Sequence, residues 1–141
     1  MSETEIPLGL IQGRACVTRR AADAMLRVLG ATQITLRILA PSNGDTNSQL
    51  GLTPPISEDL LIEPALVETM LPSASGARRF KVTLSARALK PIAEAHGVED
   101  VAAWLLTAEG VLYHDKLMHV DTVIIDHFAG AEYLYHIVAT E

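Results

Sequence analysis

The sequence predicts an α+β fold, a small and mostly antiparallel β-barrel or sandwich with an N-terminal helix and a helical insertion before a C-terminal hairpin. Two β-rich runs, 116–128 and 132–140, are joined by a short loop that carries Gly130, which is typical of a β-hairpin. The strands follow one another as hairpins instead of alternating with helices. With 141 residues, of which 49% are hydrophobic, the chain can bury the core of one domain, so we expect a single domain over residues 1–141.

The N-terminal helix is predicted from Thr18 to Leu29, with Thr18 as its cap and Gly30 at the stop position. Its apolar stripe consists of Ala22, Met25, Leu26 and Leu29. Arg19 and Arg20 then fall in the first turn, where the helix dipole disfavours cations. We therefore expect both arginines to contact carboxylates or phosphates of a partner. Solvated surface charges are the alternative.

A half-buried strand is predicted at 34–38, where apolar and polar residues alternate, and it ends at Pro41. Residues 42–58 are rich in Asn, Ser, Thr, Gly and Pro, so we expect a flexible loop there. Such loops order on docking in many assemblies, and Asp45 within this loop is a predicted interface residue.

The next predicted strand, 60–68, contains Pro64, which lacks the amide hydrogen that a central strand donates. We expect an edge strand or a bulge at this point, and we count Pro64 among the interface residues. A strand at 79–84 pairs with it as a hairpin. The helical insertion follows, first from Ser85 to Gly97 and then from about Val98 to Ala108.

The formal net charge is −6 and the isoelectric point is near 5.3. A nucleic-acid binder must neutralise many phosphates, so we expect no direct nucleic-acid partner. The acidity is uneven, because up to Leu50 five arginines face four acidic residues, whereas from Gly51 onward six basic residues face thirteen acidic ones. The acidic character therefore belongs to the C-terminal part.

We expect a soluble, cytoplasmic protein. Met1 is not followed by a basic region and an apolar run, so no signal peptide is expected. No apolar stretch reaches the roughly 20 residues of a membrane-spanning helix, so no membrane partner is expected. Cys16 is the one cysteine, which excludes an internal disulfide, and we expect it to be buried as a small apolar residue.

The sequence contains no catalytic signature. Neither a Gly-x-Ser-x-Gly elbow nor a glycine-rich phosphate loop is present, so we expect no enzymatic activity and no cofactor. His119 and Asp121 are spaced to ligate one metal ion and share a strand face with Val123 and Ile125. His127 on the same face would lie about 27 Å from His119, at ~3.3 Å per residue. A metal needs three or four converging ligands, so we expect none to be bound.

Between residues 60 and 140 the chain runs through the strand segments Leu60–Val67 and Arg79–Ala86, a helical pair, the segment Gly110–Tyr113, and a hairpin with Gly130 and a Tyr-bearing second strand, Tyr133–Ile137. This order resembles the small head–tail connector and neck proteins of tailed phages and prophage-like elements. In that family a compact β-barrel or sandwich with a helix on one side ends in such a hairpin.

The resemblance implies a structural, non-enzymatic role in virion assembly, with self-association in a ring and docking to other virion or prophage proteins. The location would then be cytoplasmic or virion-associated. Two other classes stay open. A small-molecule-binding module would place His119, Asp121 and Tyr135 at a barrel mouth, and a metal-dependent enzyme would need a third ligand near His119.

Overall fold

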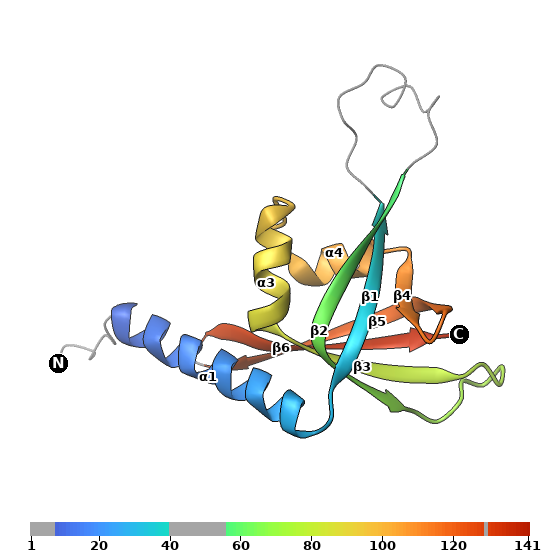
Figure 1. Ribbon diagram of the computed structural model, residues 1–141, viewed down its shortest axis with the longest axis horizontal. Coiled ribbons are helices and arrows are strands. Elements are labelled where there is room, and N and C mark those ends of the chain that lie inside the picture. Colours follow the sequence, from blue (N-terminus) through green and yellow to red (C-terminus); the bar gives the residue numbers. More distant parts are fainter. Residues whose placement is uncertain (1–7, 40–55, 129) are drawn as a thin grey trace, which may run out of the picture.

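The protein is a six-stranded antiparallel β-barrel with helices outside it, so the predicted small α+β barrel is confirmed (Figure 1). The computed structural model describes residues 8–39, 56–128 and 130–141. In chain order the elements are α1 (Leu8–Val28), β1 (Thr32–Leu39), β2 (Ser57–Thr69), β3 (Arg79–Ser85), α3 (Ala86–Ala95), α4 (Val101–Thr107), β4 (Gly110–Tyr113), β5 (Lys116–Phe128) and β6 (Ala131–Thr140). The order of neighbouring strands around the barrel is β1-β2-β3-β6-β5-β4.

Two long-range strand pairs convert the local hairpins into a barrel. β3 pairs with β6 from Arg79↔Thr140 to Ser85↔Leu134, which joins the β2–β3 hairpin to the C-terminal β5–β6 hairpin. β4 pairs with β1 through Thr35↔Leu112, Leu36↔Val111 and Arg37↔Gly110, and this short seam closes the sheet. Every strand therefore has a neighbour on both sides.

One hydrophobic core fills the barrel and extends beneath two helices. Tyr135, Leu36 and Ile137 are fully buried among the inward-facing residues of the strands, and Leu89 of α3 and Leu105 of α4 join the same cluster. α3 begins where the Ser85 hydroxyl accepts a hydrogen bond from the Ala88 amide, and α4 begins where Asp100 accepts one from Ala103. The predicted helical insertion between the strands is thus present as two short helices.

Helix α1 begins at Leu8, so the predicted start at Thr18 is wrong. A threonine is a common N-cap, but it is also tolerated inside a helix when its hydroxyl bonds locally. The helix ends as predicted, because Gly30 has a φ of +85° and the Ala31 amide donates to the Leu26 carbonyl. Arg19 and Arg20 consequently lie in the middle of the helix, and the argument from the dipole at its first turn does not apply to them.

A bulge in β2 accommodates Pro64, as one of the two predicted solutions requires. Thr32 pairs with Ala65 and Ile34 with Ile62, so two residues of β2 oppose one residue of β1. The alternative of an edge strand is excluded, because β2 pairs with both β1 and β3. Pro64 is buried, which leaves its side chain no surface for a partner.

The predicted flexible loop at 42–58 falls largely outside the described residues, and so does Asp45. Its last two residues were assigned wrongly, since Ser57 and Glu58 pair with Leu39 and Ile38 as the first residues of β2. The polar composition that predicted a loop there reflects the solvent-facing start of a strand.

Replacing Ile137 by Ala should lower the free energy of unfolding by about 2–5 kcal/mol, because the side chain is fully buried in the barrel. Ile124 on the neighbouring strand is 51% exposed and provides the matched control. Ile124→Ala should change stability by less than about 0.5 kcal/mol. Urea unfolding of both variants checks this, and equal losses would mean that the faces of the hairpin are assigned wrongly.

Glu141 should make the stability of the folded state depend on pH. Its carboxylate binds Arg78 and Lys116, which lowers its pKa from the usual value. A depressed pKa stabilises the folded state above the unfolded-state pKa, and this stabilisation is lost as the pH falls through the folded-state pKa.

Glu141→Gln should therefore lower the melting temperature slightly at neutral pH and match the parent protein in acid. Glu99→Gln, at another exposed glutamate, is the control and should follow the parent at every pH. Melting curves between neutral and acid pH measure both differences. A Glu141→Gln difference that does not depend on pH would contradict the assignment.

Candidate functional site

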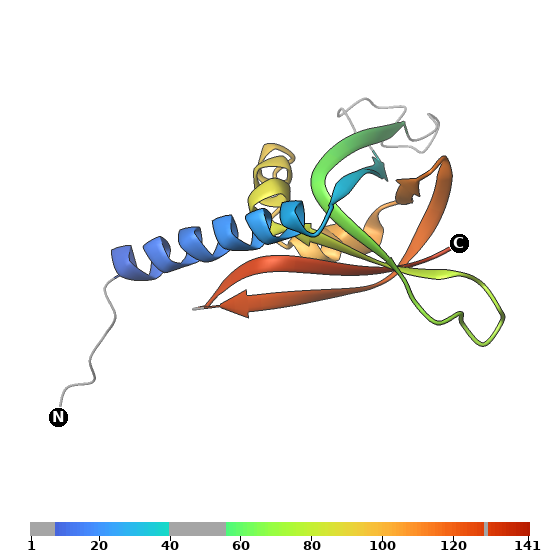
Figure 2. The same ribbon diagram turned by 60° about the horizontal axis from the view of Figure 1, so that its bottom comes forward.

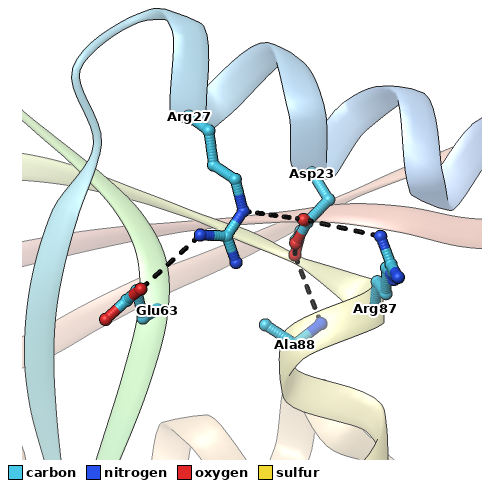
Figure 3. A network of polar contacts seen from close by, with 6 residues as sticks. Asp23, Arg27, Glu63, Arg87 and Ala88 are labelled. Carbon is cyan, nitrogen blue, oxygen red and sulfur yellow. Dashed lines mark hydrogen bonds and ion pairs between the residues drawn. The ribbon is translucent and has the colours of Figure 1, made fainter.

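A polar pocket lies where α1 meets β2 and the start of α3 (Figure 3). Asp23 and Arg27 of α1, Glu63 of β2, and Arg87 and Ala88 of α3 line it, and its volume is about 410 Å³. Asp23 and Arg27 are one helical turn apart, so the same face of α1 presents both side chains. Charged side chains from three elements therefore meet in this pocket, beside the C-terminal end of α1.

Asp23 is the buried centre of this site. The residue is only 5% exposed. Its Oδ1 accepts a hydrogen bond of 2.8 Å from the Ser85 hydroxyl, and its Oδ2 accepts one of 3.1 Å from Arg27 Nε. An Arg87 nitrogen lies 3.8 Å from the same Oδ2. Partners on both oxygens compensate for the loss of solvation that a buried carboxylate suffers.

The charges of the pocket balance one another. Arg27 also lies 3.5 Å from a Glu63 carboxylate oxygen. Its pKa is raised, first by the hydrogen bond and charge of Asp23 and further by Glu63. Two guanidinium groups face two carboxylates, and both Asp23 oxygens accept a hydrogen bond from within the protein. We therefore interpret this cluster as a clamp that fixes α1 on the barrel.

A second group of polar side chains forms a row of hydrogen bonds across the outside of the adjacent strands β3, β6 and β5. The Thr83 hydroxyl lies 3.1 Å from His136 Nδ1, and His136 Nε2 lies 2.6 Å from an Asp126 carboxylate oxygen. With Nε2–H donating to Asp126, a neutral imidazole accepts the Thr83 proton at Nδ1. Hydroxyl, imidazole and carboxylate stand in the order of a nucleophile and its base. Thr83 is only 4% exposed, however, so its hydroxyl offers a substrate almost no surface.

A bulge in β5 overturns the predicted common face of the metal-ligand candidates. Val120 pairs with Ala139 and Thr122 with Val138, which leaves Asp121 without a partner in the ladder. The inside–outside alternation reverses there. Val123 packs against the core, whereas Asp121 is exposed, so these two side chains do not share a face.

The candidate ligand residues do not converge. His119, Asp121 and His127 are all exposed, and Asp121 accepts a hydrogen bond from the Thr140 hydroxyl. Within residues 8–39, 56–128 and 130–141, no group of three or more His, Cys, Asp or Glu could hold a metal ion. Tyr135, the third residue of the predicted small-molecule site, is buried and donates to Glu132, so it lies on the opposite face of the sheet from His119. Burial is the main cause that raises the pKa of Tyr135, followed by its hydrogen bond to Glu132.

The two arginines predicted at an interface have different environments. Arg19 Nε donates to the backbone carbonyl of Glu132 at 3.0 Å, so this residue holds α1 against β6. Arg20 is exposed and makes no ion pair or hydrogen bond with the part of the chain that the structure describes. Cys16 is exposed as well, so the expectation that it is buried is wrong.

The face of α1 turned away from the barrel is apolar, which the sequence did not reveal. Ala22 and Leu26 face the barrel and pack with Leu134. On the opposite side, at helical spacing, lies a set of exposed residues that we call the α1 stripe. It consists of Val17, Ala21, Ala24, Met25 and Val28. Val28 is 86% exposed.

The outside of β5 carries a second exposed apolar surface, which we call the β5 outer face. Ile124 and Phe128 are both exposed, and Asp126 lies between them on the same side of the strand. Leu117 and the bulged Asp121 are exposed further along the strand. Acidic and apolar side chains therefore lie together on this surface, near the exposed His119 and Thr122.

Comparisons of the chain with protein-family models, with curated proteins and with solved structures gave no match. None of the described helices is both long and apolar enough to span a membrane.

Within the clamp, Asp23 should contribute more to the stability of the fold than Arg27. Asp23→Ala should cost about 1–3 kcal/mol, because it removes a buried acceptor and leaves the buried Ser85 hydroxyl unpaired. Arg27→Ala should cost less than about 1 kcal/mol, because the Arg27 side chain is exposed and Asp23 retains Ser85 and Arg87. Urea unfolding of the two variants measures the difference. A larger loss for Arg27→Ala would contradict the clamp.

Proposed function

We propose that this protein is a non-enzymatic structural subunit that acts by self-association and by docking to partner proteins, in the manner of a phage head–tail connector or neck protein. One observation carries the proposal: α1 packs on the barrel with one face and presents the α1 stripe to solvent with the other. The resemblance of residues 60–140 to connector and neck proteins supplies the more specific role in virion assembly.

Helix α1 has more apolar surface than its packing against the barrel uses. A surface helix of a monomer normally has one apolar face and one polar face, whereas α1 exposes Val17, Met25 and Val28 opposite its packed face. Burying apolar surface is favourable by roughly 25 cal/mol per Å². A contiguous exposed patch of this kind is typical of a protein–protein contact.

Closure of the barrel limits how copies could associate. The strands form a closed barrel, but β4 pairs with β5 only from Lys116 to Met118, so the rest of β5 has one strand neighbour, β6, among the described residues. The proposed association uses side-chain surfaces. α1 and the β5–β6 hairpin extend from the same side of the barrel and lie beside each other in both views, where a neighbouring subunit can reach them (Figures 1 and 2).

Light scattering at several concentrations tests the proposal. The mass of the parent protein should rise above the 15.2 kDa of one chain as concentration increases. A double variant, Val17→Glu with Met25→Glu (the α1 variant), should weaken association at least about tenfold, because it places two charges in the contact.

Leu71→Glu is the matched control, since Leu71 is exposed outside α1, and it should associate like the parent. Thermal melts of the variants establish that each is folded. A parent protein that stays monomeric at every concentration, or an α1 variant that associates like the parent, would contradict the proposed function.

A further inference from the structure

We infer that the α1 stripe of one copy binds the β5 outer face of a second copy. This inference rests on the proposed function and adds to it the identity of the receiving surface. Both surfaces expose large apolar side chains, Val17 and Met25 on the helix and Ile124 and Phe128 on the strand. Apolar character alone does not determine which of these surfaces binds which. The charged residues beside them favour one pairing.

The α1 stripe is flanked by a basic residue, and the β5 outer face contains acidic ones. α1 contains four arginines and one aspartate, a formal charge of +3, in a chain whose net charge is −6, so the remaining residues carry −9. Arg20 flanks the α1 stripe without an ionic partner among the described residues. The β5 outer face carries Asp126 and the bulged Asp121. Docking α1 on β5 therefore brings opposite charges together.

If each surface paired with the same surface of another copy, like charges would come together instead. Two α1 stripes packed against each other would bring Arg20 of both copies close together, and two β5 outer faces would bring Asp121 and Asp126 of both copies together. Like charges across an interface disfavour it, so the mixed contact is preferred.

The dimensions of the two surfaces agree. From Val17 to Val28 the helix rises about 16 Å, at ~1.5 Å per residue. From Ile124 to Phe128 the strand extends about 13 Å, at ~3.3 Å per residue. The apolar part of the helix can thus cover the apolar end of β5.

The contact uses two different surfaces of the same chain, so each copy offers one helix and one strand face. A two-fold dimer satisfies both by making the contact twice, and a ring satisfies both by repeating it around an axis. In either assembly, disrupting the α1 stripe or disrupting the β5 outer face should each be enough to prevent association.

A complementation experiment tests the inference. The α1 variant is compared with a β5 variant, Ile124→Glu with Phe128→Glu, and each should remain monomeric alone. An equimolar mixture should form a one-to-one complex, because the β5 variant retains an intact helix and the α1 variant an intact strand face. Native mass spectrometry resolves the two chains, since their masses differ.

Cross-linking provides a second measurement that does not disturb the surfaces. Cys16 is exposed on α1, one helical turn before Arg20, and is the one cysteine of the chain. With Phe128→Cys, a short bismaleimide should link Cys16 of one copy to the introduced thiol of another and give a covalent dimer. The parent protein should give much less dimer, because its helices do not pair with each other.

The outcomes separate the two proposals. If the β5 variant associates like the parent while the α1 variant does not, or if the parent cross-links efficiently through Cys16 alone, the inference is wrong and the proposed function stands. If the parent is monomeric at every concentration, the proposed function itself is wrong. Restored association in the mixture, with cross-links between positions 16 and 128, supports the inference.

Discussion

Closure of the barrel depends on a close approach at Gly110, the first residue of β4. A Cβ atom at this position would overlap the carbonyl oxygen of Met118 on β5 and crowd the Leu117 side chain. Only glycine lets β4 lie between β1 and β5. This four-residue strand joins β1 to the start of β5 and so closes the barrel around the core.

The position of α1 on the closed barrel then determines which side chains meet solvent. Asp23 binds Ser85, the residue that also caps α3, so one buried carboxylate connects the two helices. Arg19 adds a bond to the β6 backbone on the same side of the helix. Because these contacts fix the rotation of α1 about its axis, they also turn Val17 and Val28 away from the barrel. The clamp and the α1 stripe are two consequences of one helix orientation.

Features that depend on local sequence could be predicted, and features that depend on register could not. Alternation at 34–38, the Gly30 stop and the C-terminal hairpin all come from neighbouring residues, and all are present. The β5 bulge at Asp121 and the contact between Thr83 and His136 arise only when strands pair across the barrel. The helix was predicted with Met25 buried, because α1 is apolar on two sides and periodicity alone does not say which side packs.

The uneven charge of the chain has a physical consequence for assembly. The residues outside α1 together carry a formal charge of −9, which disfavours contact between two copies unless an opposing charge intervenes. The basic helix supplies that charge together with apolar area, on a rigid element held by the clamp. Since a preorganised helix loses little conformational freedom on docking, the clamp that stabilises the fold also favours association. In the assembly proposed above, folding and association would therefore both depend on the orientation of α1.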